Sequence, residues 1–459
     1  MHKLVRVSLL SWSVLVVSLS AQTSMLPLPA APLNLAYQSA SASGRGSSAD
    51  APTLLTRQEA EKISLANNPQ ISVTRLLALA QKQVVRETRA DYLPTLFGSV
   101  TGVGAEQASR LATGSLASSR LLNHMGAGVE LNQLISDFGR TTNLIASSSL
   151  QAKAAAANAE ATREDIVLAT DLAFYRALEA QATLEVAKST VAARQSVDDQ
   201  VRALTASKLK SDLDLSFADV NLSEAKLLVL DAQNNVDAAN AQLNEILGLP
   251  TMKQYQLVDD TAAPSALAPD SDALIQSALQ QRPDLMALDL AHQAAQKFTR
   301  AQREQLLPTV SAMGVVGTTP LGSSTYYSPN WYGAAAVNIN VPIFNGFRFT
   351  AEASEADFRA KAVSEQTRNL HDRIVRDVRT AWLTANTDQQ RMLVTKQLVM
   401  EANSALDLAK ARYQLGLGSI VELSQAQLQQ TQAAISDANA KYLFESDMAA
   451  IRFQTGTQP

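Results

Sequence analysis

The residue types that carry covalent and metal chemistry are almost absent from this chain. It contains no cysteine and only four histidines in 459 residues, which excludes disulfides, thiolate nucleophiles and cysteine-linked lipid anchors. It has no phosphate-binding glycine loop, zinc signature or EF-hand spacing. We therefore expect no enzyme activity, no cofactor and no metal site. The formal net charge of -4 gives no basic footprint for nucleic acid.

Two acidic residues stand out as candidates for a functional site. Asp214 and Glu422 lie at equivalent places in the two halves of the chain, each three residues after a serine, Ser211 or Ser419. Carboxylates that cluster in a constriction attract cations and raise one another's pKa. A single carboxylate in the first turn of a helix is, alternatively, a solvated group that the helix dipole favours. The residues alone leave both interpretations open.

Very long helices must position these acids. Residues 140–247 contain neither glycine nor proline, and residues 348–415 lack both as well. Both stretches are rich in alanine, leucine, glutamine and charged residues, which favour helices. Helices over residues 141–205 and 349–415 would each be about 100 Å long. A helix of that length does not fit inside one compact domain.

The two halves of the chain repeat one another. The Leu-Pro-Thr triplet at residues 93–95 recurs at 307–309, and residues 209–225 share six identities with residues 417–433. Each half therefore predicts a helix, a strand, a variable loop, a second strand and a long helical hairpin. A change in loop length between the two copies is easily tolerated.

The predicted strands cover residues 96–104 and 124–134 in the first half, and 309–317 and 332–343 in the second. Apolar residues alternate with Glu130 and Asn132, and with Asn338 and Asn340. A period of two gives a strand one apolar and one polar face. This fits a barrel with lipid outside and water inside, although a half-buried soluble sheet shows the same pattern. Four strands cannot close a barrel, since about eight are needed, so several chains would have to share one.

The first residues have the features of an export signal. Residues 1–20 combine two basic residues with an apolar run and a small-residue end, as in a secretory signal peptide. Residues 21–53 are rich in alanine, serine and proline and predict a flexible arm. The body then divides into a first repeat (54–249), a connector (250–270) and a second repeat (271–457). Asp259, in the connector, is expected to be a solvated linker residue.

These motifs occur in the same order in both halves of the chain, and together they resemble the TolC family of outer-membrane efflux proteins. The resemblance covers residues 54–453 and rests on three segments: Leu55-Thr56-Arg57-Gln58-Glu59-Ala60 with Asn67-Asn68-Pro69, Val341-Pro342-Ile343-Phe344-Asn345-Gly346, and Arg412-Tyr413-Gln414-Leu415-Gly416-Leu417-Gly418-Ser419. It implies a mainly α tandem-repeat protomer. Three protomers would each give four strands to one shared 12-stranded outer-membrane β-barrel and would pack their coiled-coil helices into a trimeric periplasmic α-barrel.

The resemblance also implies a function and partners. The homotrimer would sit in outer-membrane lipid as the exit duct of a tripartite efflux or type I secretion system. It would passively conduct cargo delivered by a periplasmic adaptor (membrane fusion) protein and an inner-membrane RND, ABC or MFS pump. The few histidines and ordinary methionine usage argue mildly against a dedicated metal exporter. An exported coiled-coil structural or adhesion protein without a pore is the alternative.

Residue roles follow from the same resemblance. The periplasmic entrance, with its gate and charge ring, would involve Glu422, Asp214, Tyr413, Arg412 and Gln425. The hairpin turns would use Gly416, Gly418, Ser419, Lys208 and Ser211. The strand-to-helix junctions would use Pro342, Gly346 and Gly139. The barrel lumen would be lined by Asn338, Asn340, Glu130 and Asn132.

Three positions depart from the family. Gln425 stands where members often carry a second acid, which predicts a weaker cation ring. Gly418 replaces a basic residue found in some members, and Lys208 replaces the usual hairpin glycine, which leaves the tightness of that turn open.

Overall fold

The computed structural model describes residues 53–103, 110–111, 119–120, 124–250, 253, 255–259, 267–318, 321–323, 326–328 and 331–457. All of them belong to one unit of the chain, Pro52–Pro459. The predicted signal peptide, the predicted arm up to residue 52 and residue 104 of the first predicted strand lie outside the described residues.

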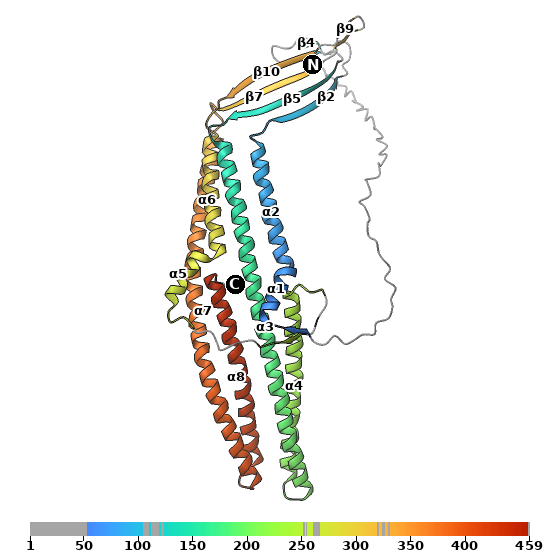
Figure 1. The fold of residues 1–459 in the computed structure, drawn as a ribbon, viewed down its shortest axis with the longest axis vertical. Helices are drawn as coiled ribbons and strands as arrows, with labels where there is room; N and C mark the ends of the chain where they lie inside the picture. The colour runs from blue at the N-terminus through green and yellow to red at the C-terminus, as the bar shows by residue number, and fades with distance from the viewer. Residues whose placement is uncertain are drawn as a thin grey trace, which may run out of the picture. The chain divides into compact units, whose positions relative to one another are not determined.

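The helices of the two halves match in order and in length (Figure 1). Helices of 11 and 22 residues open each half: α1 (Arg57–Asn67) and α2 (Pro69–Ala90), then α5 (Ser271–Gln281) and α6 (Pro283–Glu304). The long helices α3 (Arg140–Ala206) and α7 (Arg348–Gln414) have 67 residues each, and the helices that return from them, α4 (Asp212–Ile246) and α8 (Ile420–Thr455), have 35 and 36. At 1.5 Å per residue, α3 and α7 are each about 100 Å long, which confirms the prediction from their composition.

Local capping explains where the first helices begin. The Thr56 hydroxyl accepts a hydrogen bond from the Glu59 amide at 3.3 Å, and the Glu59 carboxylate accepts one from the Thr56 amide at 3.1 Å. The two residues thus form a capping box. Pro69 and Pro283 occupy the first positions of α2 and α6, where a missing N–H leaves no helical hydrogen bond unmade.

Four antiparallel strands lie at the opposite end of the long helices from the hairpin turns (Figure 1). Their order is β10 (Trp331–Asn340), β7 (Thr309–Thr318), β5 (His124–Ser136) and β2 (Thr95–Val103), so the central pairing joins the two halves of the chain. Two short strands extend this sheet: β8 (Leu321–Ser323) pairs with β5, and β9 (Tyr326–Ser328) pairs with β8. β3 (Arg110–Leu111) and β4 (Ser119–Arg120) form a separate antiparallel pair. Among the described strands, β10 pairs only with β7 and β2 only with β5. β10 ends three residues before the predicted end at 343, because Pro342 has no N–H for a sheet ladder.

The segment between the two repeats contributes to the core. β6 (Tyr255–Leu257) pairs in parallel with β1 (Thr53–Leu55). Asp259 follows β6 and accepts a hydrogen bond from the Tyr442 hydroxyl of α8 at 3.1 Å, and it also pairs with Lys441. Asp259 is exposed, as expected of a solvated linker residue, but these two contacts also connect it to α8. Its Ala/Pro-rich surroundings in the sequence carry no sign of the helix that it meets in the fold.

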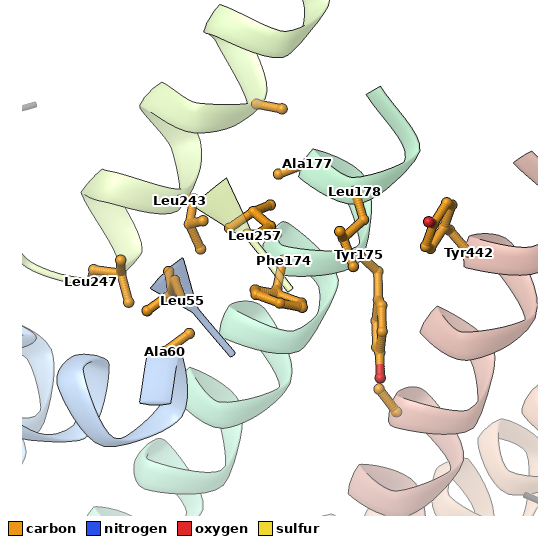
Figure 2. Packing of buried hydrophobic residues seen from close by; sticks show 13 residues of the cluster. Leu55, Ala60, Phe174, Tyr175, Ala177, Leu178, Leu243, Leu247, Leu257 and Tyr442 are labelled. Carbon is orange, nitrogen blue, oxygen red and sulfur yellow. The ribbon is translucent and has the colours of Figure 1, made fainter. Parts of the chain in front are cut away.

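Figure 2 shows apolar side chains that converge around the β1–β6 pair. Phe174 of α3 is 1% exposed and belongs to the same buried cluster as Leu55, Leu243 and Leu257. Tyr442 brings α8 of the second repeat into this cluster. Burying one such side chain contributes roughly 1.5–3 kcal/mol, so this core fixes the middle of α3 against both repeats.

A group of charged side chains connects α1, α3 and α8. The Arg57 guanidinium contacts Glu61 and lies 3.3 Å from Asp171 Oδ2, and Arg452 lies 3.4 Å from the same oxygen. Glu61 and Asp171 are 8% and 2% exposed. Burial raises the pKa of Glu61 to about 7, Asp171 adds to the rise, and the two arginines oppose it.

This raised pKa predicts that the folded chain loses stability as pH rises. A carboxyl group with a higher pKa in the folded state binds more protons when folded, so the free energy of unfolding falls between about pH 4.5 and about pH 7. We expect a higher melting temperature near pH 5.5 than near pH 8. Glu61→Gln should reduce the difference in the free energy of unfolding between these two pH values by about 1–3 kcal/mol. Burial and Asp388 likewise raise the pKa of Asp447 to about 7, so part of the slope should remain.

The matched control is Glu185→Gln, whose side chain is 72% exposed and pairs only with Lys188 of its own helix among the described ion pairs. Melting curves of this variant should keep the full pH dependence of the wild type. The prediction would be contradicted if the wild-type melting temperature did not decrease when the pH is raised from 5.5 to 8. It would also be contradicted if Glu61→Gln showed the same pH dependence of the melting temperature as the wild type.

Candidate functional site at the hairpin tips

The two hairpin turns have the same backbone conformation. Lys208 has φ 59° and Gly416, at the equivalent position, has φ 75°. The Leu209 amide bonds to the Leu204 carbonyl at 2.9 Å, and the Leu417 amide bonds to the Arg412 carbonyl at 2.8 Å. The first tip thus turns as tightly as the second, although a lysine in the left-handed region costs about 1 kcal/mol.

Serine caps begin both return helices, but the acids that follow them differ in their contacts. The Ser211 and Ser419 hydroxyls each accept a hydrogen bond at 3.2 Å, from the amides of Asp214 and Glu422. Asp214 then reaches back to the Ser211 amide at 3.1 Å and completes a capping box. Glu422 instead turns toward the preceding helix.

The partner of Glu422 is Arg412, in the last turn of α7. Arg412 Nε lies 2.9 Å from Glu422 Oε1, and the two side chains are 47% and 42% exposed. Arg412 Nη2 also donates to the Leu417 carbonyl at 3.2 Å. One guanidinium therefore joins both helices of this hairpin and the turn between them.

Tyr413 holds the two hairpins of the protomer together. It is 3% exposed and packs with side chains from α3, α4 and α8: Val197, Val201, Ala218, Ile420 and Leu423. Lys210 of the other hairpin places its Nζ 4.2 Å from the centre of the tyrosine ring. The hydroxyl is buried and has no hydrogen-bond partner among the described residues. Burial, with a smaller contribution from Asp214, raises the pKa of Tyr413.

Gln425 lies one turn beyond Glu422, on the exposed side of α8. The hydroxyl of its neighbour Ser424 accepts a hydrogen bond at 2.6 Å from the side-chain Nδ2 of Asn221 in α4. The two hairpin turns lie at the same end of the described unit (Figure 1). Contacts of Lys210 with Tyr413 and of Asn221 with Ser424 connect the two hairpins.

Left-handed residues turn the chain from strand to helix in both repeats. Gly139 has φ 110° and follows Phe138 at φ 56°, and Gly346 has φ 65° and precedes Phe347 at φ 64°. In the first repeat Asp137 accepts hydrogen bonds from the Gly139 and Thr141 amides at 3.2 and 2.7 Å. Pro342 lies in the irregular segment between β10 and this turn.

The strand register places the four predicted lumen residues on one face of the sheet. Asn338 lies opposite Ser311 and Asn340 opposite Thr309, while Glu130 and Asn132 lie opposite Val315 and Met313 of the same strand, β7. Directly opposed residues share a face, and residues two apart along a strand do too. The other face carries mainly apolar residues: Leu96, Val100, Val129, Leu131, Val316, Val337 and Ile339.

The comparison with known proteins agrees with this architecture. A family model described as "Outer membrane efflux protein" matches residues 62–249 and 274–457. The chain belongs to this family. The two matched segments coincide with the two structural repeats, and the family assignment inferred from the motifs is confirmed.

Relatives of this outer-membrane efflux protein are similar over most of their length. It is 25% identical over 443 residues to the outer membrane protein TolC of Escherichia coli (strain K12), covering 91% of this chain and 85% of that protein. It is 25% identical over 415 residues to the outer membrane protein OprJ of Pseudomonas aeruginosa, covering 87% and 85%. The solved outer-membrane channel OprN shares its fold, with a TM-score of 0.78 and 19% identity over 88% of this chain and 90% of that one.

These relatives are outer-membrane proteins and channels by name, not enzymes. Within the described residues, no helix combines the length and the apolar character needed to cross a membrane.

Sequence reasoning did not find two contacts at the tips. The ion pair of Arg412 with Glu422 spans ten residues across a turn, and the contact of Lys210 with Tyr413 joins different repeats. The first could have been proposed, because a basic residue that ends one helix faces an acid that begins the next. The second required the packing of the two hairpins.

Proposed function

We propose that this protein is the outer-membrane exit duct of a tripartite efflux or secretion system. Three chains would pool their strands in one 12-stranded barrel and their helices in a periplasmic tunnel. A periplasmic adaptor and an inner-membrane RND, ABC or MFS pump would deliver the cargo, and the duct would conduct it passively. Within the chain we propose the division already described: signal peptide 1–20, arm 21–53, repeats 54–249 and 271–457, and connector 250–270.

The observation that carries this proposal is the sheet at the end of the 100 Å helices, whose four long strands are β2, β5, β7 and β10. Its edges, β2 and β10, have one partner each among the described strands, and unpaired edges invite pairing with another chain. Pairing of β10 of one copy with β2 of the next closes the sheet and satisfies both edges. A coiled-coil rod without a pore gives no reason for a sheet with one polar and one apolar face.

Cysteine cross-linking tests the proposed strand pairing directly. The chain has no cysteine, so Ser99→Cys on β2 and Ala336→Cys on β10 introduce the only two thiols. Both positions lie on the face that carries Asn338 and Glu130. A short bifunctional thiol reagent should yield covalent trimers of the double variant and no trimers of either single variant. The same products from single and double variants would reject the pairing.

We further propose that Asp214 and Glu422 line the periplasmic entrance. Three copies of each would surround the axis, and Gln425 would add no charge. Glu422→Ala should then lower the preference for cations over anions and weaken block by multivalent cations. The measurement is the reversal potential of the purified protein in a planar lipid bilayer under a salt gradient. Glu365→Ala, at an exposed position far from the tips, should leave both properties as in the wild type; an unchanged reversal potential and block in Glu422→Ala would refute the assignment.

A further inference from the structure

The charged residues of the second hairpin tip balance one another. Arg412 and Glu422 are the only charged residues between positions 412 and 422. In the first tip, the two positive charges of Lys208 and Lys210 equal the two negative charges of Asp212 and Asp214 in number. Both tips therefore carry acids without a net charge. A ring of three Glu422 side chains would come with three arginines.

The structure shows why Arg412 stays beside Glu422. Its Nε donates to the carboxylate at 2.9 Å while its Nη2 donates to the Leu417 carbonyl at 3.2 Å. Two donors of one planar group are thus fixed at once, which an ammonium group on a flexible stem cannot reproduce. The Arg412 carbonyl in turn accepts from the amides of Leu417 and Gly418 at 2.8 and 3.1 Å. Backbone and side chain of Arg412 both close the turn.

Gly418 provides the space for this ion pair. A β-carbon at this position would lie 3.2 Å from Arg412 Cβ and 3.2 Å from Glu422 Oε2. Such contacts are tighter than ordinary van der Waals packing, so a side chain there would push the two partners aside. The first tip has Lys210 at the equivalent position and Leu204 where the second has Arg412. The ion pair is therefore confined to the second repeat.

We propose that Arg412 determines the ion selectivity of the entrance by neutralising Glu422 within its own hairpin. The inference rests on the proposed function, because it requires the tips to line a conducting pore. It adds that the carboxylate of Glu422 is not a free cation site. The neighbouring positive charge sets the local potential that permeating ions meet.

The test is a cycle of variants recorded in planar bilayers under a KCl gradient. Arg412→Gln exposes three carboxylates and should raise the potassium-to-chloride permeability ratio by roughly twofold or more. Glu422→Gln leaves three unpaired arginines and should lower the ratio below the wild-type value. The double variant has no charge at either position and should return close to the wild type. Arg412→Lys keeps the charge although it loses the paired hydrogen bonds, so its ratio should lie much closer to the wild type than that of Arg412→Gln.

The pattern of the cycle separates a charge effect from a structural one. If the role of Arg412 were purely structural, Arg412→Gln and Arg412→Lys would change the permeability ratio alike. Adding Glu422→Gln to Arg412→Gln would then not restore the wild-type ratio. Either that pattern, or an unchanged ratio in Arg412→Gln, would overturn the inference while leaving the duct intact. If the wild-type trimer conducts no ions at all, the proposed function itself fails, and the inference fails with it.

Discussion

Val337→Arg is expected to remove the protein from the outer-membrane fraction, whereas Asn338→Arg is expected to leave it there. The two residues are neighbours in β10, and the strand register puts them on opposite faces of the sheet. Val337 belongs to the apolar face, which would meet lipid in the proposed barrel, and the residue is 65% exposed in the single chain. Arginine near the middle of a bilayer costs about 2–4 kcal/mol.

The threefold assembly multiplies this effect. Three arginines on the lipid face would cost about 6–12 kcal/mol per trimer, enough to abolish assembly. Arginine at Asn338 would instead point into water beside Asn340. Both variants should be followed by membrane fractionation and by the mass of the detergent-extracted protein. Equal recovery of the two variants would mean that the two faces do not separate lipid from water.

Gly248→Ala is expected to cause the largest loss of stability among substitutions in the helical part. Gly248 has φ +68°, and a β-carbon there would lie 2.7 Å from the Asn67 carbonyl oxygen and 3.1 Å from the Asn68 amide nitrogen. Both are backbone atoms at the junction of α1 and α2, so they cannot move aside as a side chain could. The left-handed conformation and the overlap together should cost about 2–4 kcal/mol.

A matched control separates the two contributions. Gly416 has φ +75°, and a β-carbon there would meet no atom of the described residues within 4 Å, so Gly416→Ala should cost only about 1 kcal/mol. Thermal unfolding followed by helical circular dichroism measures both. Equal shifts in melting temperature would show that contact with Asn67 contributes nothing.

The second repeat contains the counterpart of this glycine contact. Gly456 ends α8 at φ +66°, and its β-carbon would meet the Gln281 carbonyl carbon at 3.1 Å. Gly248 and Gly456 are 208 positions apart, and each packs against the residues just before Pro69 or Pro283. Both repeats therefore close in the same way, with the glycine after the last helix seated on the junction of the first two helices.

Much of this fold could be predicted because its causes are local. The absence of glycine and proline over residues 140–247 and 348–415 predicted the long helices, and α3 and α7 have 67 residues each. Alternation around Asn338 and Glu130 specified strands and their faces. The apolar pattern continues to Ile343, but β10 ends at Asn340 because Pro342 cannot donate a ladder hydrogen bond.

The remaining features depend on contacts between distant parts of the chain. The pairing of β6 with β1, and the contact of Asp259 with Tyr442, arise only once α8 lies beside the connector. At the site, the sequence named Arg412 and Glu422 but not their pairing. Lys208 shows the limit of residue preference, since it adopts the left-handed conformation of Gly416, the glycine at the equivalent position of the second repeat.

The native mass of wild-type protein extracted in detergent from the outer membrane tests the central proposal most directly. One mature chain cannot close the sheet, so the proposal predicts a particle of three mature chains that resists extraction by salt or carbonate. Native mass spectrometry after removal of the detergent measures this mass. A monomer or an elongated dimer released without detergent would contradict the shared barrel, and the proposed entrance at the hairpin tips would be rejected with it.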